Sequence, residues 1–110
     1  MTKTTAVAVL LLAAVLEAGG DAVVRLGLKQ HSGMRIGFFG IGALMLFVYG
    51  YTVNAPDWDF GNLLGLYVVF FFVIAQLVSW FVFHQPPSRI TIAGGSLIVA
   101  GGLVLSAARF

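Results

Sequence analysis

The sequence contains no cysteine and little charge. Without cysteine, the chain has no disulfide, no thiolate metal site and no cysteine nucleophile. Six Lys and Arg and four Asp and Glu make up the charged 9% of its 110 residues, with no basic run that would bind nucleic acid. The sequence also lacks a glycine-rich phosphate loop, a metal-ligating cluster and a nucleophile paired with a base. We therefore expect no enzyme activity, no metal, no cofactor and no nucleic-acid partner.

Apolar residues, in contrast, fill 60% of the chain. A water-soluble domain of this size could not bury so much apolar surface, so the expected solvent is the lipid bilayer. A spanning helix needs roughly 20 apolar residues, and four segments meet this need: residues 5–28, 36–53, 61–83 and 90–108. Because the connections between them are short, neighbouring helices should be antiparallel. We predict an all-α bundle of four transmembrane helices in a single integral membrane domain, residues 1–110.

The ends of the chain allow two further interpretations. Lys3 followed by the apolar run of residues 6–16 is compatible with a secretory signal peptide, but the apolar pattern resumes after Gly20 and favours a spanning helix. Lys and Arg in the connections outnumber those at the termini by only three to two. The positive-inside rule then favours termini outside, with a margin small enough for dual topology. The expected location is the inner (plasma) membrane.

The first apolar segment carries three ionisable residues. Glu17, Asp21 and Arg25 are spaced four residues apart, so they share one helical face, with a rise of about 6 Å between successive members. An Asp followed by an Arg at this spacing is a favourable pair, so we predict a structural Asp21–Arg25 ion pair. Glu17 is then left near mid-span without a cation in its own helix, where a charge costs about 2.5 to 3.5 kcal/mol.

Two interpretations of Glu17 follow. An intramembrane carboxyl that faces protein or water can bind a proton and a cationic solute in turn, and such residues mark ion and substrate pathways. Alternatively, Glu17 is a protonated residue whose hydrogen bonds hold helices together. The first interpretation is favoured. Asp21, Tyr67 and Gln76 are further candidates for this binding site, since a tyrosine ring or hydroxyl can contact a cation, although packing roles are common for such residues.

Small residues indicate close helix contacts. Gly20 lies in the first segment, and Gly94 and Gly101 lie seven residues apart on one face of the fourth. This spacing permits a close seam between two helices. Because one four-helix unit encloses little space for a solute, a dimer is expected.

Three stretches resemble the small multidrug resistance transporters, a branch of the drug/metabolite transporter superfamily. "LEAGGDAVVR" resembles the family's mid-helix Glu followed three residues later by Gly, and "GLYVVFFFVIAQLVSWFVFHQ" resembles its third helix. The match puts Glu17 on the proton- and substrate-binding carboxylate, Gly20 on the family's Gly, and Tyr67 where multidrug members carry a substrate-contacting Trp. "GGSLIVAGG" resembles the family's dimerisation pattern, carried here by Gly94, Leu97, Ile98 and Gly101.

The resemblance implies an antiparallel homodimer, or a heterodimer with a paired homologue, in which two Glu17 carboxylates face a shared chamber. It also implies proton-coupled efflux of small cationic or guanidinium-like compounds by alternating access. The implied partners are the lipid bilayer, a second copy or a homologue, and a small organic cation.

The sequence departs from the multidrug pattern at several positions. Val69, Phe70 and Phe71 stand where the family has Gly-Val-Gly, and bulky residues there should stiffen the helix. Leu64 stands in place of a Tyr, Asp21 in place of a small or polar residue, and no counterpart is found for the second-helix aromatics. These departures favour a divergent transporter with another substrate. They also keep open a non-transporting or heterodimeric membrane subunit, such as an assembly partner or one half of a lipid-carrier flippase.

Overall fold

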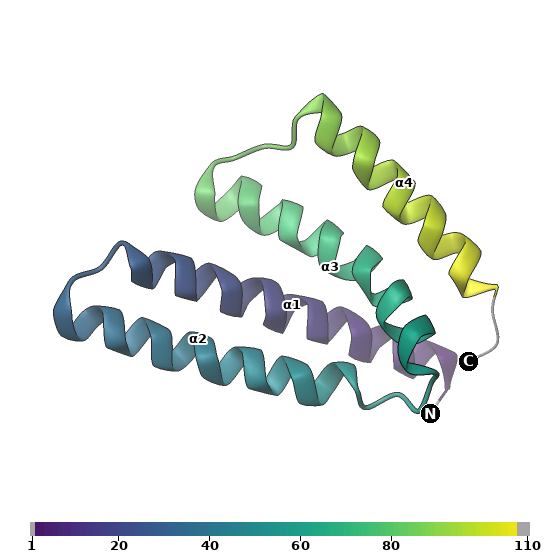
Figure 1. The fold of residues 1–110 in the computed structure, drawn as a ribbon, viewed down its shortest axis with the longest axis horizontal. Coiled ribbons are helices and arrows are strands. Elements are labelled where there is room, and N and C mark those ends of the chain that lie inside the picture. The colour runs from purple at the N-terminus through teal and green to yellow at the C-terminus, as the bar shows by residue number, and fades with distance from the viewer. Residues whose placement is uncertain (1, 108–110) are drawn as a thin grey trace.

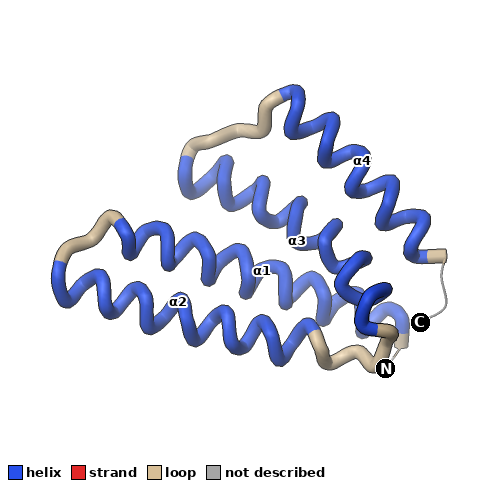
Figure 2. Tube along the Cα trace, viewed as in Figure 1, coloured by secondary structure: helices blue, strands red, loops and turns tan. Residues whose placement is uncertain are grey.

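The computed structural model describes residues 2–107 as four helices joined by three short connections (Figures 1 and 2). The helices are α1 (Lys3–Leu28), α2 (Ser32–Val53), α3 (Phe60–Phe83) and α4 (Arg89–Ser106). All four are long and apolar enough to cross a membrane, and no strand occurs in this part of the chain. The predicted all-α fold with four spanning helices is confirmed. The predicted end of the fourth span, Ala108, lies outside the described residues.

Local chemistry explains where several helices begin and end. At the start of α1, the Thr2 side chain accepts a 3.1 Å hydrogen bond from the backbone N–H of Thr5. Ser88 caps α4 in the same way, through a 3.2 Å bond from the N–H of Thr91. Such caps satisfy N–H groups that have no partner within the helix. α3 ends at His84, whose backbone is left-handed with a φ of 56°, and two prolines in the following connection prevent the helix from continuing.

The helices lie side by side in the order α2, α1, α3, α4 (Figure 1). α1 contacts both α2 and α3, whereas α4 packs mainly on α3. α1 and α2 are antiparallel, as are α3 and α4, in agreement with their short connections. The molecule measures 48 × 34 × 19 Å, so the helices form an open layer. The outer faces of α2 and α4 are therefore left for lipid or for another chain.

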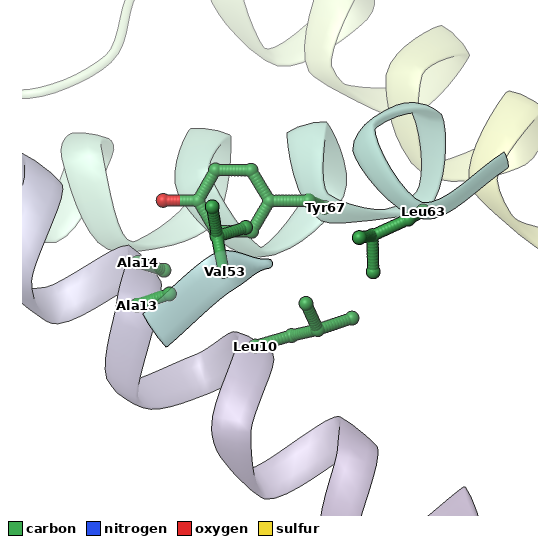
Figure 3. Close-up of a cluster of buried hydrophobic side chains, with 6 residues drawn as sticks. All are labelled: Leu10, Ala13, Ala14, Val53, Leu63 and Tyr67. Carbon is green, nitrogen blue, oxygen red and sulfur yellow. The ribbon is translucent and has the colours of Figure 1, made fainter. Parts of the chain in front are cut away.

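A buried cluster lies where α1, α2 and α3 meet. Its members are Leu10, Ala13, Ala14, Val53, Leu63 and Tyr67 (Figure 3). The two alanines allow α3 to approach α1 closely, as small residues do in membrane helix contacts. Tyr67, only 4% exposed, is held by this cluster beside the middle of α1.

Glycines allow α1 and α2 to pack backbone against backbone. A Cβ atom added to Gly20 would lie 3.3 Å from the carbonyl oxygen of Gly42, and one added to Gly42 would lie 3.2 Å from that of Gly20. The side chain of Leu46 covers Gly20, and that of Val24 covers Gly42. Gly20 thus lies in the α1–α2 contact, where a larger residue would push the helices apart.

A second pair of glycines joins α4 to α3. Gly95 and Gly102 are buried, and a Cβ atom on them would meet the side chains of Phe72 and Val69, respectively. Val69 is the first of the three bulky residues that stand in place of Gly-Val-Gly, and its side chain packs against Gly102 of α4. Side chains of α3 thus occupy the space that the two glycines leave open on α4.

Candidate functional site

The centre of the candidate site is a hydrogen bond between α1 and α3. The Tyr67 hydroxyl donates to Oε1 of Glu17 over 2.8 Å. Glu17 is partly buried and Tyr67 is buried, so the bond is partly shielded by the surrounding helices. A hydrogen bond to a carboxylate is stronger than one between neutral groups. The structure thus joins the two residues on which the predicted site depends, and their part in binding stays a prediction.

Tyr49 of α2 completes the surroundings of this carboxyl group. Its ring centroid lies 5.6 Å from that of Tyr67, which brings the Tyr49 side chain close to the same carboxyl group. Three helices therefore converge on one acid. Tyr49 was not among the predicted site residues, because the second segment carries no charge and resembles the transporter pattern only in hydrophobicity. The available signal was a pair of tyrosines, Tyr49 and Tyr51, near the end of an otherwise apolar span, and the sequence does not tell which of them faces α1.

Asp21 and Arg25 do not pair with one another. In the part of the chain that the structure describes, no ion pair joins them. The Arg25 guanidinium carbon instead lies 5.4 Å from the ring centroid of Phe83, and the Lys29 ammonium nitrogen lies at the same distance. The negative face of an aromatic ring attracts both cations. The structure differs here from the predicted pair because the long Arg side chain reaches across to the end of α3.

A cavity of about 340 Å³ opens between α1 and α3, one turn beyond Glu17. Asp21, Arg25 and Gln76 are among the residues that line it. Phe71 also lines the cavity and packs against Tyr67, with 6.3 Å between the ring centroids. The structure therefore brings the predicted site residues Asp21 and Gln76 together in this cavity, beside the Glu17–Tyr67 bond and not in contact with it.

The residues of the proposed dimer seam lie on the open face of α4. Gly94 and Gly101 have no atom within 4 Å of an added Cβ, and Leu97 is 76% exposed. Ile98 is partly buried. This face is therefore distinct from the one on which Gly95 and Gly102 receive α3, and no atom of residues 2–107 lies within 4 Å of a Cβ added at Gly94 or Gly101.

Between residues 2 and 107, no group of three or more His, Cys, Asp and Glu gathers that could hold a metal ion. The acids of the site are Glu17 and Asp21 on one helix face, and their surroundings are phenols, an amide and a guanidinium. Such a set can hydrogen-bond, exchange a proton and hold a charged organic group.

Comparison with known proteins extends along the whole chain. A membrane protein of the UPF0060 family from Rhodococcus erythropolis is 33% identical over 112 residues, which cover 99% of this chain and 100% of the relative. A UPF0060 membrane protein from Kineococcus radiotolerans is 32% identical, covering 99% of this chain and 98% of the relative. This chain belongs to the UPF0060 family of membrane proteins.

A third UPF0060 relative, from Mycolicibacterium vanbaalenii, is 35% identical over 89% of this chain and 91% of its own length. No family model matches the chain, and no solved structure does. The family name describes membrane proteins, in agreement with four helices that are long enough to span a bilayer. The matches to these three UPF0060 proteins thus cover at least 91% of each relative.

Proposed function

We propose that this UPF0060 protein is a proton-coupled exporter of small cationic or guanidinium-like compounds in the inner (plasma) membrane. Glu17 binds the proton and the solute in turn, and no covalent chemistry is involved. The observation that carries the proposal is the 2.8 Å hydrogen bond from the buried Tyr67 to Glu17, near the middle of a membrane-spanning helix. Acids at this depth are costly and are typical of ion and substrate pathways.

Coupling follows from mutual exclusion at one carboxyl group. A deprotonated Glu17 offers a negative charge to a cation, whereas a protonated Glu17 offers none. Proton binding therefore releases the solute, and solute binding releases the proton. Tyr67 and Tyr49 hold the carboxyl in place during this exchange, and their ring faces are available to a cation. Asp21 and Gln76 belong to the path of the solute in this proposal.

The resemblance to small multidrug resistance transporters supports both the transport function and a dimer. The four helices form an open layer, so two copies, or this chain and a paired homologue, would enclose the Glu17 residues between them. The uncovered face of α4, with Gly94 and Gly101 on it, offers a seam for this contact. An antiparallel arrangement of the copies agrees with the weak bias of Lys and Arg between the two sides, which permits dual topology.

The proposal is tested by transport in reconstituted vesicles with an imposed proton gradient. The wild-type protein should carry a guanidinium-like cation against a proton flux, and Glu17→Gln should abolish this transport while leaving the fold intact. Asp57→Asn, which neutralises an exposed acid outside the helices, is the matched control and should transport normally. Proton-driven transport that survives Glu17→Gln would overturn the proposal.

One observation favours a second candidate, a non-transporting or heterodimeric membrane subunit. Val69 interlocks with Gly102, so the pair α3–α4 is stiffer than a helix with Gly-Val-Gly would be. A subunit that does not change between inward-open and outward-open states would not need α3 to bend. A neighbouring gene for a second four-helix homologue, together with transport only when both chains are reconstituted, would favour this candidate.

A further inference from the structure

The cavity between α1 and α3 contains polar groups that the protein leaves without hydrogen bonds. Among residues 2–107, neither the Asp21 carboxylate nor the Gln76 amide has a hydrogen-bond or ion-pair partner, and Arg25 has only the Phe83 ring. All three side chains line the same space of about 340 Å³. Polar groups within the depth of a membrane need partners, because lipid supplies none. Asp21 and Arg25 are exposed at this cavity, so a polar solute that enters it can pair with both groups.

The charges of the cavity indicate what this occupant carries. Asp21 and Arg25 lie one helical turn apart, a rise of about 6 Å, and the two groups do not neutralise one another. The α1 side of the cavity thus carries a negatively charged hydrogen-bond acceptor, Asp21, and one turn further along the helix a positively charged donor, Arg25. A simple cation would satisfy Asp21 and leave Arg25 without an anion. A simple anion would leave Asp21 without a cation.

We propose that the solute is zwitterionic, with a cationic group and an anionic group at opposite ends of a short chain. On the path of the solute to Glu17, Asp21 binds the cationic end, and the Arg25 guanidinium binds the carboxylate or phosphate at the other end. The Gln76 amide, on the facing helix α3, hydrogen-bonds the solute between these ends. Guanidinium groups suit this task, since their fork of N–H donors matches the two oxygens of a carboxylate.

This inference rests on the proposed function, because it names the substrate class of the transporter whose proton site is Glu17. The cavity borders that site through Phe71, which packs against Tyr67 on one side and lines the cavity on the other. A solute with its cationic end at Asp21 is therefore one turn from Glu17 along the same helix face. An ordinary monocation has no anionic group to bind Arg25, so the site should bind it more weakly than the zwitterion.

The test is the binding of two probes of equal size to detergent-solubilised full-length protein, measured by isothermal titration calorimetry. γ-Guanidinobutyrate carries both charges, whereas γ-guanidinobutyramide has the same shape and only the cation. Wild-type protein should bind the zwitterion at least about tenfold more tightly, the effect of one charge-assisted contact. A wild-type protein that binds the two probes equally, prefers the amide or binds neither probe would overturn the inference, and this comparison needs no variant.

Variants then assign the preference to Arg25. Arg25→Gln should bring the ratio of the two affinities close to one, and Arg25→Lys should retain part of the preference. Lys29→Gln is the matched control: it removes an equal charge that lies over the same Phe83 ring but does not line this cavity. The preference should survive in this control. An Arg25→Gln protein that keeps the full preference would contradict the assignment.

The same titrations separate the two proposals. If the amide binds with proton release that Glu17→Gln abolishes, but the zwitterion has no advantage, the exporter remains supported and the zwitterion inference fails. If the zwitterion is preferred through Arg25 but no proton is released, the cavity binds zwitterions and the proton coupling of Glu17 fails.

Discussion

The Tyr67 hydroxyl donates a 2.8 Å hydrogen bond to Glu17 across 50 positions of sequence. This bond joins a buried phenol of α3 to an acid of α1 at membrane depth, and Tyr49 of α2 lies against both. Side chains of three spanning helices thus lie around one carboxyl group. A proton or a cation that binds to Glu17 should therefore change the contacts between these helices.

Tyr67→Phe should weaken solute binding while leaving the packing of α3 in place. The substitution removes the hydroxyl donor but keeps the ring that contacts Tyr49 and Phe71. A hydrogen bond to a charged group contributes about 1.5 to 3 kcal/mol, so the affinity for a guanidinium-like cation should fall about tenfold or more. Tyr51→Phe, at a tyrosine that is 78% exposed on α2, should have no effect. If Tyr67→Phe and the wild type bind the cation with equal affinity, the hydrogen bond between Tyr67 and Glu17 does not contribute to solute binding.

Neighbouring glycines of α4 should respond to valine in opposite ways. Gly102→Val would drive a side chain into Val69 of α3, and such overpacking costs about 1 to 3 kcal/mol, so thermal unfolding in detergent should begin at a lower temperature. Gly101→Val, where nothing lies within 4 Å, should leave the monomer stable. If the open face of α4 forms the dimer seam, Gly101→Val should instead lower the fraction of protein that is recovered as a dimer after chemical cross-linking. A Gly101→Val protein that dimerises as wild type does would exclude this seam.

The contact between α1 and α2 allows a second matched pair. Gly42→Ala would put a Cβ atom 2.6 Å from the Val24 side chain and 3.2 Å from the Gly20 carbonyl oxygen, so a loss of about 1 to 3 kcal/mol is expected. Gly40→Ala meets open space and removes a flexible residue from a helix, which is neutral or stabilising by up to about 1 kcal/mol. Unfolding temperatures measured in the same detergent compare the two variants. Equal stabilities would mean that α1 and α2 are not in close contact at Gly42.

The helices were predictable from the sequence, but the directions that their side chains take were not. Length and hydropathy are local properties, so the four spans lie within a few residues of their predicted bounds. α4, however, carries two glycine pairs with seven-residue spacing, offset by one position, and both satisfy the same seam pattern. Only the approach of Val69 and Phe72 from α3 distinguishes the pair that packs within the chain from the pair that is open.

In the candidate site, too, some residues could be identified from the sequence and others could not. Glu17 could be singled out because an unpaired acid at mid-span is costly wherever its helix packs. The ion pair of Asp21 and Arg25 was predicted from helical spacing alone, which ignores the Phe83 ring at the end of α3 that attracts the guanidinium group. Tyr49 could not be assigned because its role depends on the contact between α2 and α3, two helices that meet only around the buried cluster.

Proton release on solute binding tests the central claim most directly. A guanidinium-like cation is added to weakly buffered, detergent-solubilised protein, and the change in pH is recorded for wild type and for Glu17→Gln over a range of starting pH values. Because proton and cation exclude one another at Glu17, wild-type protein should release up to about one proton per bound cation at pH values where Glu17 is protonated. Glu17→Gln should release none. Equal proton release from the two proteins would contradict a shared proton and solute site at Glu17.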